Sequence, residues 1–226
     1  MSNVSSIVKQ CLLKLDKYNV EGGKFHKNKG EKDITTPLGI YRGANDIELF
    51  DYIEEWFKTK KGLSSIKKTS DFTQDDINFL NTEYNKKGDF YDKVMEDSTT
   101  FYNKYLGKID ISSFASVLRY PFFNIFVNSK KVAIKAIQMS YCDKNNKNRD
   151  KKLCDGIYGP TTEKMIKEYN GDMNATNSLF YTSIFLKNVM ICYVEMCTDN
   201  GRDDAQLPFL KGWTNRVDAI YKDLLQ

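Results

Sequence analysis

Apolar residues recur at intervals of three and four along most of this chain, the spacing that places them on one face of an α-helix. The first such series consists of Val4, Ile7, Val8, Cys11, Leu12 and Leu15. It predicts an amphipathic helix that ends near Tyr18. Similar series predict a helix with Asp46 as its N-cap and Ile47, Phe50, Ile53 and Phe57 on one face. Others predict helices over 73–88, 89–106, 122–139, 175–197 and 210–225, and a short one beginning at Thr161 or Thr162. Thr73 followed three residues later by Asp76 resembles a capping box with aspartate in place of glutamate.

The helical spacing is interrupted over residues 19–43. This segment contains five of the 13 glycines together with Pro37, and its apolar residues are sparse. Glycine and proline at this density favour turns, and short apolar stretches between turns are typical of strands. We therefore expect a mainly α fold with a small β-hairpin or sheet insert near residues 22–42, directly after the first helix.

A second break lies at residues 143–152, which contain no apolar side chain. A run of charged and amide residues of this kind is typical of a solvated loop. We take it as the boundary between two domains, 1–150 and 151–226. The chain of 226 residues is long enough for one large domain or for a domain with a smaller companion.

Charge and hydropathy narrow the classes of protein. The net charge of +4 is lower than that of dedicated nucleic-acid binders, but it suits an anionic polymer as substrate. Residues 1–15 lack the features of a secretory signal, and the continuous apolar runs fall far short of the ~20 residues that span a bilayer. We therefore expect synthesis in the cytoplasm, no transmembrane helix and no nucleic-acid partner.

The chain has five cysteines and one histidine, so few side chains are available for a metal site or for catalysis by a thiol. No Cys-x-x-Cys pair occurs, so a zinc site is not expected, and the odd number of cysteines indicates buried thiols. His26 would have to serve any Ser-His-Asp or Cys-His mechanism. No nucleophile motif stands beside it, so we interpret it as a loop residue and expect neither a metal nor an organic cofactor.

Carboxyl groups in and beside the insert are the strongest candidates for chemistry. Glu21 directly follows the first helix, and the two glycines after it allow the chain to turn sharply. A carboxyl group among apolar neighbours has a raised pKa, which suits a general acid. Glu31 or Asp33, together with the hydroxyl of Thr36, could then hold an attacking water. The ordinary alternative is that Glu21 is a surface residue before a glycine turn.

Several motifs resemble those of the phage-type muramidases of glycoside hydrolase family 108, which carry a predicted peptidoglycan domain. In that family the first helix ends in Glu-Gly-Gly, and a threonine followed by Gly-Ile comes later. Residues 21–23 (Glu-Gly-Gly) and 36–40 (Thr-Pro-Leu-Gly-Ile) match the two ends of this pattern. Residues 101–105 (Phe-Tyr-Asn-Lys-Tyr) resemble its tyrosine-containing helix, and residues 123–128 (Phe-Asn-Ile-Phe-Val-Asn) resemble its central helix.

The carboxyl-terminal part resembles the family more closely. Residues 155–162 (Asp-Gly-Ile-Tyr-Gly-Pro-Thr-Thr) match a turn of the peptidoglycan domain, and residues 209–217 (Phe-Leu-Lys-Gly-Trp-Thr-Asn-Arg-Val) match its terminal signature. The motifs occur in the expected order over nearly the whole chain. The chain departs from the family pattern at one place. The family has an aspartate followed by a Gly-Gly pair between the two matching ends. Counting back from Thr36, this chain has Glu31 at the position of the aspartate and Asp33 with Ile34 at the positions of the glycines.

The resemblance implies a lysozyme-like catalytic domain over 1–150 and a helical peptidoglycan-binding subdomain over 151–226. It implies hydrolysis of the β-1,4 bond between N-acetylmuramic acid and N-acetylglucosamine, with Glu21 as general acid. Glu31 or Asp33 would hold the water with Thr36, or a carboxylate would act as nucleophile. The candidate substrate contacts are Gly39, Tyr102, Asn128 and Trp213, although Trp213 would more ordinarily anchor the last helix.

Two other functions fit the same residues. A lytic transglycosylase would use the same glutamate without an activated water, and a non-catalytic wall-binding protein would need neither. In each case we expect a monomer that binds the glycan strands of peptidoglycan and does not insert stably into a membrane. Without a signal peptide it would reach the wall after release from the cytoplasm, by a holin as for a phage or prophage endolysin, or by a secretion-linked route.

Overall fold

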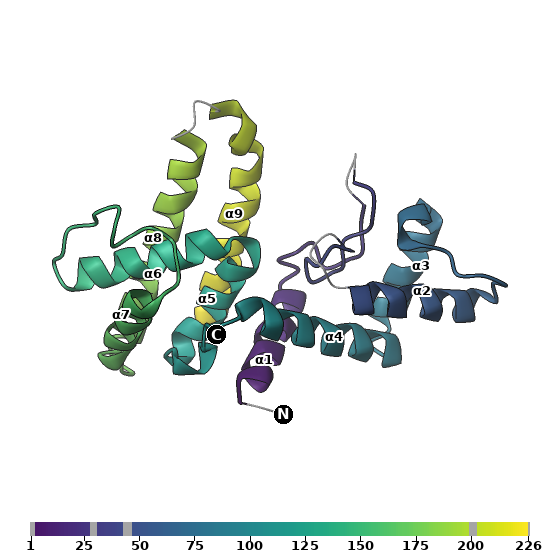
Figure 1. The fold of residues 1–226 in the computed structure, drawn as a ribbon, viewed down its shortest axis with the longest axis horizontal. Coiled ribbons are helices and arrows are strands. Elements are labelled where there is room, and N and C mark those ends of the chain that lie inside the picture. Colours follow the sequence, from purple (N-terminus) through teal and green to yellow (C-terminus); the bar gives the residue numbers. More distant parts are fainter. Residues whose placement is uncertain (1–2, 28–30, 43–46, 199–202, 226) are drawn as a thin grey trace. The chain divides into compact units, whose positions relative to one another are not determined.

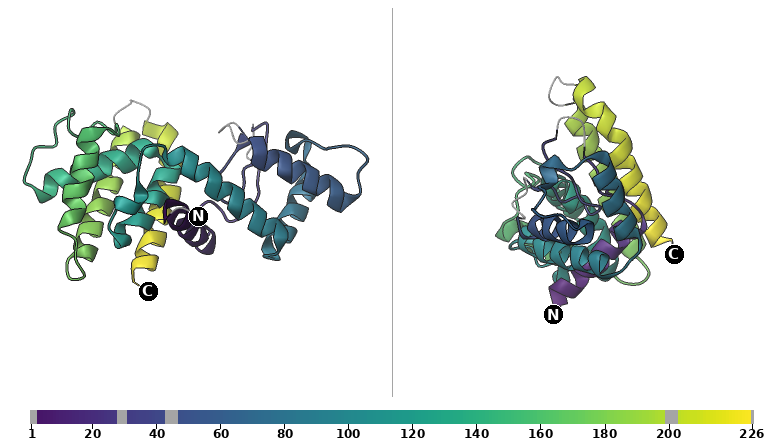
Figure 2. Two further views of the ribbon diagram at one scale, coloured as in Figure 1. Left: turned by 60° about the horizontal axis from the view of Figure 1, so that its bottom comes forward. Right: turned by 90° about the vertical axis from the view of Figure 1, so that its right-hand side faces the viewer.

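A computed structural model of the protein describes residues 3–27, 31–42, 47–198 and 203–225, and within these ranges the chain is mainly helical, as predicted (Figures 1 and 2). It divides into two compact units, Met1–Gly107 and Lys108–Gln226. This division lies well before the boundary expected at residue 150. The charged segment 143–152 is therefore a loop inside the second unit, and the functional assignment of 1–150 and 151–226 stays a prediction.

Four helices build the first unit, and α4 contacts each of the other three. They are α1 (Asn3–Lys17), α2 (Ile47–Lys61), α3 (Gln74–Asn85) and α4 (Asp89–Leu106), with the short 3₁₀ turn η2 (Thr69–Asp71) after α2. The apolar faces predicted from the sequence are buried between them. On α2, for example, Phe50, Ile53 and Phe57 are buried. Beside this face the half-buried Trp56 stacks on Phe90 of α4, with 4.0 Å between the ring centroids. The N-cap predicted at Asp46 lies outside the described residues.

The start of α3 follows the predicted capping pattern. The Thr73 side chain accepts a hydrogen bond from the backbone N–H of Asp76, and the Asp76 carboxylate accepts one from the N–H of Thr73 at 2.8 Å. These reciprocal bonds satisfy two backbone donors that the first turn of a helix leaves without intrahelical partners. Aspartate therefore substitutes for the more common glutamate at the third position of the box.

The predicted β-hairpin or sheet is wrong for the described part of the insert, where no strand forms. Two isolated antiparallel bridges stand in its place, between His26 and Thr35 and between Thr35 and Tyr41. A tight turn at residues 36–39 separates Thr35 from Tyr41, and Pro37 within it has no N–H to donate to a ladder. Pairing is therefore limited to single residues, and the side chains of Phe25, Ile34, Leu38 and Ile40 anchor the segment by burial.

Six helical elements form the described part of the second unit. They are the 3₁₀ turn η3 (Ile111–Ser113), α5 (Ser116–Asn128), α6 (Lys130–Lys144), α7 (Pro160–Gly171), α8 (Ser178–Thr198) and α9 (Asp203–Leu224). Helix α8 contacts α5, α6 and α9, and α6 also contacts α7. The last two helices run side by side in opposite directions (Figures 1 and 2).

The apolar stretch 122–139 forms two helices, not the single one predicted. The chain becomes extended at Ser129, between α5 and α6. The Ser129 side chain accepts a hydrogen bond from the N–H of Val132 at 3.3 Å, so this residue ends one helix and caps the next. The apolar pattern continues across the break because both helices are buried. A serine in such a stretch is the sequence signal that the prediction overlooked.

Helix α8 is the long apolar helix predicted over 175–197, and it bears on the expectation that the chain has no transmembrane helix. Among the described helices, its segment 178–197 is long and apolar enough to cross a membrane, by length and composition alone. The prediction of no such segment relied on unbroken apolar runs, and here polar residues such as Thr182, Lys187 and Asn188 interrupt the run without lowering its mean hydropathy below that of a membrane span. In this structure α8 packs against α5, α6 and α9.

A single glutamine holds the turn that precedes α7. The Gln138 side-chain amide donates to the carboxylate of Asp155 at 2.9 Å and to the hydroxyl of Thr162 at 3.0 Å. Its side-chain oxygen accepts from the N–H of Gly156 at 2.9 Å. The motif that resembles the peptidoglycan-domain turn is therefore a structural turn fixed to α6, and α7 starts one residue before the predicted Thr161, at Pro160.

Candidate functional site

Glu21 follows a helix end whose geometry is set by a Schellman motif. The N–H of Val20 donates to the carbonyl of Leu15, and the N–H of Asn19 donates to the carbonyl of Asp16, both at 3.1 Å. Asn19 has a φ of 51°, the left-handed conformation that this motif requires. Because these bonds end α1 at a fixed place, the position of Glu21 relative to the helix is determined by the backbone.

The Glu21 carboxyl group lies directly against Gly39, on the far side of the insert. A Cβ atom at Gly39 would stand 3.0 Å from Cδ and 3.1 Å from Oε2 of Glu21. Gly39 also has a φ of 81°, which residues with a side chain rarely adopt. The sequence prediction placed both residues in the site, and the structure brings them into contact.

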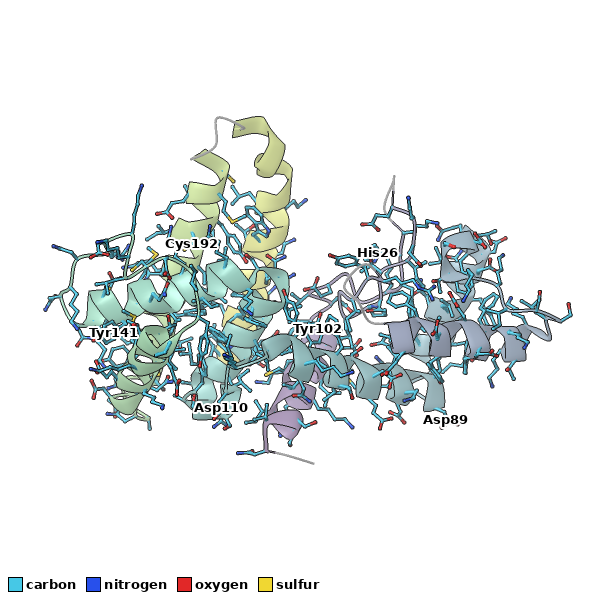
Figure 3. All side chains as sticks on the ribbon, in the orientation of Figure 1. His26, Asp89, Tyr102, Asp110, Tyr141 and Cys192 are labelled. Carbon is cyan, nitrogen blue, oxygen red and sulfur yellow. The ribbon has the colours of Figure 1, made fainter. Side chains whose placement is uncertain are left out.

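Two other residues predicted for the site, Thr36 and Tyr102, form hydrogen bonds with the turn that carries Gly39. The N–H of Gly39 donates to the carbonyl of Thr36 at 3.0 Å, and the hydroxyl oxygen of Thr36 accepts from the N–H of Ile40 at 3.1 Å. On α4, the hydroxyl of Tyr102 donates to the carbonyl of Leu38 at 2.8 Å. Thr36 and Tyr102 are both buried, and both bond to the turn that carries Gly39. Tyr102 is labelled in Figure 3.

The two candidates for a second carboxylate lie in different surroundings. Glu31 is exposed. One oxygen of Asp33 accepts from the N–H of Ile34 at 2.8 Å, and the other lies 3.8 Å from the guanidinium of Arg42. Asp33 is therefore tied to the backbone and to a cation.

Arg42 also pairs with a buried carboxylate that the sequence analysis did not single out. Glu54 on α2 accepts hydrogen bonds from Arg42, from Lys68 at 2.8 Å and from the N–H of Thr69 at 2.9 Å. Burial acts to raise the pKa of Glu54, but the hydrogen bonds from Arg42, Lys68 and Thr69 outweigh it and hold the pKa below its ordinary value. Its sequence signal is a charge on the apolar face of α2, next to Ile53.

The remaining substrate candidates, Asn128 and Trp213, lie in the second unit and take part in packing. The Asn128 side-chain oxygen accepts from the hydroxyl of Tyr193 at 3.2 Å. Trp213 stacks on the ring of the same Tyr193 at 4.6 Å between centroids and is only 8% exposed. Trp213 therefore anchors α9 against α8, which is the ordinary interpretation given above. The structure does not gather these two residues with Glu21 in one unit.

The histidine and the cysteines have surroundings that fit structural roles. His26 forms a bridge with Thr35, and its Nδ1 lies 3.1 Å from the carbonyl of Lys24. All five cysteines are buried as thiols. Burial raises the pKa of Cys154 to about 12 and that of Cys192 to about 11, so both are poor nucleophiles near neutral pH. Among the described residues, no group of three or more His, Cys, Asp or Glu side chains is placed to hold a metal ion.

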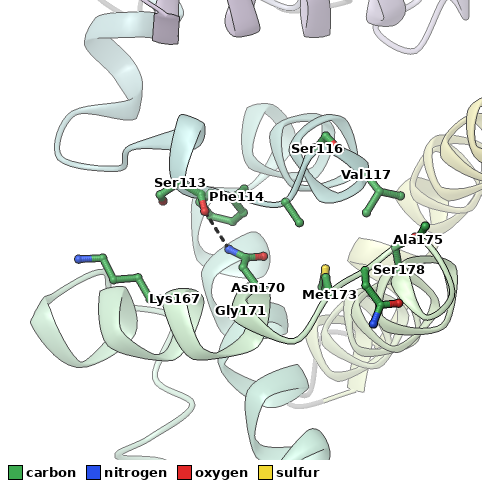
Figure 4. Close-up of a pocket in the computed structure, with 12 residues that line it drawn as sticks. Ser113, Phe114, Ser116, Val117, Lys167, Asn170, Gly171, Met173, Ala175 and Ser178 are labelled. Carbon is green, nitrogen blue, oxygen red and sulfur yellow. Dashed lines mark hydrogen bonds between the residues drawn. The ribbon is translucent and has the colours of Figure 1, made fainter.

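A cavity of about 630 Å³ opens in the second unit between the start of α5 and the segment that joins α7 to α8 (Figure 4). Asn170 and Ser113 both line the cavity, and the Asn170 side-chain amide donates to the carbonyl of Ser113 at 3.3 Å. The cavity is lined by small, polar and apolar residues, among them Phe114, Lys167 and Met173. None of the residues predicted for the site lines it.

No protein-family model matches the chain, and neither a curated protein nor a solved structure matches it.

The contact between Gly39 and Glu21 predicts a functional effect of Gly39→Ala. The left-handed backbone should cost about 1–2 kcal/mol of folding stability, and the new Cβ must displace the carboxyl group. A displacement of about 1 Å at a catalytic group costs on the order of 10²-fold in rate, so wall-clearing activity should fall by about that factor if Glu21 is the general acid that the family resemblance implies. Thermal unfolding and turbidity loss of a cell-wall suspension measure the two effects.

Gly62→Ala is the matched control. Gly62 also has a positive φ, 64°, but a Cβ there would meet nothing within 4 Å. It should lose a similar amount of stability and keep its activity. Equal activity losses in the two variants would show that backbone strain, and not the Glu21 contact, is responsible.

Proposed function

We propose that this protein is a lysozyme-like peptidoglycan hydrolase that cleaves the β-1,4 bond between N-acetylmuramic acid and N-acetylglucosamine, with Glu21 as general acid. The observation that carries the proposal is the placement of the Glu21 carboxyl group on Gly39, across from the end of α1. The absence of a side chain at Gly39 leaves room for the carboxyl group, because a Cβ atom there would stand 3.0 Å from its Cδ. The motifs that resemble the muramidase family support the same assignment.

In the proposed reaction Glu21 donates its proton to the glycosidic oxygen while the bond from that oxygen to the sugar C1 breaks. The residues around it have supporting roles. Tyr102 fixes the turn through the Leu38 carbonyl, and the Thr36 hydroxyl oxygen accepts from Ile40 within the same turn. Water, activated by Glu31 or by Asp33, would complete hydrolysis.

A lytic transglycosylase is the second candidate, and two contacts favour it. The Thr36 hydroxyl is buried and bonded within its turn, and Asp33 is bonded to a backbone N–H and lies near Arg42. Both residues are thus occupied with contacts inside the protein. A mechanism that needs only Glu21 would have the same carboxylate take the proton from the sugar O6 as O6 attacks C1, forming a 1,6-anhydro ring.

Digestion of purified peptidoglycan followed by mass spectrometry of the fragments tests both candidates. Hydrolysis leaves a reducing N-acetylmuramic acid end, which is heavier by one water than the 1,6-anhydro end that a transglycosylase leaves. We expect soluble fragments of one of these two kinds. If the protein binds the wall and releases no fragment, the wall-binding function without catalysis is the correct one.

A further inference from the structure

Two exposed tyrosines, Tyr41 and Tyr105, belong to the two segments that meet at the Leu38 carbonyl. Tyr41 is 55% exposed and Tyr105 is 41% exposed. The ring of Tyr105 lies 6.2 Å from that of Tyr102, whose hydroxyl donates to the carbonyl of Leu38, three residues before Tyr41. Burial raises the pKa of Tyr105, and Tyr41 raises it further. Phe101 stacks on Tyr105, with ring planes at 10° and centroids 5.8 Å apart.

The same contacts that position Glu21 also position these two rings. Tyr102, which holds the Leu38 carbonyl, lies one helical turn before Tyr105 on α4. Tyr41 follows Gly39 by two residues, and its backbone is fixed by the bridge to Thr35. The contact of Tyr102 and the contact of Glu21 therefore fall on adjacent residues of one short turn, Leu38 and Gly39, and Tyr41 follows two residues later.

The chemistry of a tyrosine pair selects its ligand. The flat ring offers an apolar face to the C–H groups on one side of a pyranose ring, and the phenol group exchanges hydrogen bonds with hydroxyl and acetamido groups. The stacking contact with Phe101 restricts the Tyr105 ring, so less conformational freedom is lost when a sugar stacks on it. A glycan strand offers such a ring at every residue on either side of the bond to be cleaved.

We propose that Tyr41 and Tyr105 form a sugar-binding platform that stacks one hexosamine ring of the glycan strand beside the bond that Glu21 protonates. The proposal rests on the proposed function, because a glycan substrate defines the ligand. It replaces the expectation that Tyr102 contacts substrate. Tyr102 is buried beneath the turn, whereas Tyr105, one turn further along α4, reaches the surface.

Binding and kinetics of single variants test the platform. The probes are the soluble tetrasaccharide of β-1,4-linked N-acetylglucosamine, for binding by calorimetry, and purified peptidoglycan, for turnover. Tyr41→Ala and Tyr105→Ala should each raise the Kd for the tetrasaccharide and the KM for peptidoglycan about tenfold, with kcat changed less than KM. Tyr41→Phe and Tyr105→Phe keep the stacking surface and should stay within about threefold of the wild type.

Phe180→Ala is the control, because Phe180 is an exposed aromatic side chain on the second unit. It should leave Kd and KM unchanged, and thermal unfolding should show that all variants are folded. Unchanged Kd and KM in both tyrosine-to-alanine variants of an active enzyme would overturn the platform and leave the proposed function standing. If the tetrasaccharide affinity depends on both tyrosines while Glu21→Gln keeps full activity, the platform stands and the catalytic assignment fails. A wild type that neither binds nor cleaves glycan overturns both.

Discussion

Replacing Glu21 by glutamine is expected to slow the clearing of a peptidoglycan suspension by about 10²–10⁴-fold, the usual contribution of a general acid. Glutamine has nearly the shape of glutamate and can occupy the same place over Gly39, but it has no acidic proton to give to the glycosidic oxygen. Binding to sedimented cell walls should persist, because the rest of the substrate contacts remain. Initial rates of turbidity loss and a wall pull-down measure the two properties.

The matched control for this variant is Glu96→Gln on the exposed face of α4. The Glu96 carboxylate is largely exposed and makes only a surface ion pair with Lys93, so its loss should change neither the rate nor the stability. Glu21 is only partly buried, so Glu21→Gln should unfold at the temperature of the wild type. A folded Glu21→Gln protein that clears the suspension at the wild-type rate would remove Glu21 from the mechanism.

Replacing Arg42 by alanine should destabilise the protein by about 2–4 kcal/mol at pH 7, because it removes one partner of a buried carboxylate. Glu54 is almost entirely buried, and after the substitution only Lys68 and Thr69 would remain to stabilise its charge. Chemical denaturation with an unchanged slope would give the difference in free energy of unfolding. Lys86→Ala, which removes an exposed pair with Glu83, should cost no more than about 1 kcal/mol.

The pH dependence identifies the cause of that destabilisation. In the wild type the pKa of Glu54 is held low, so its contribution to stability is present above the ordinary glutamate pKa of about 4.3 and is lost as the pH falls through the lower folded value. In Arg42→Ala, burial should raise the pKa of Glu54, and protonation then relieves the unpaired charge. The difference between wild type and variant should therefore shrink between pH 7 and pH 4. A constant difference would indicate lost packing instead.

Helix positions could be predicted from the sequence where local signals and burial agree. The helix over 89–106 has the bounds of the prediction, and the capping pattern at Thr73 predicted the start of α3. The break at Ser129 was missed because apolar periodicity does not distinguish one buried helix from two. The strands of the insert were predicted from composition, yet the turn around Pro37 allows only single bridges.

Some residues of the candidate site could be proposed from the sequence, but the hydrogen bonds and ion pairs that surround them could not. Glu21 was proposed from the sequence because it follows a helix and precedes two glycines, and Gly39 was proposed from its match to the muramidase motif. The pairing of Arg42 with Glu54 was missed, because it joins residues twelve positions apart through a fold that periodicity does not reveal. Tyr102 was predicted to contact the substrate, whereas in the structure its hydroxyl donates a hydrogen bond to the carbonyl of Leu38.

The glycines around Glu21 have a consequence for recognising relatives of this protein. Gly39 lies under the carboxyl group, and a Cβ at Gly23 would stand 2.1 Å from the side-chain oxygen of Asn19. Gly23 and Gly39 also have φ values of 61° and 81°, so the backbone favours glycine at both positions whatever becomes of the chemistry. A homologue that had lost its activity would keep these glycines for as long as it kept the fold. A search pattern built on them would collect active and inactive members alike, and the identity of the residue at position 21 would separate the two groups.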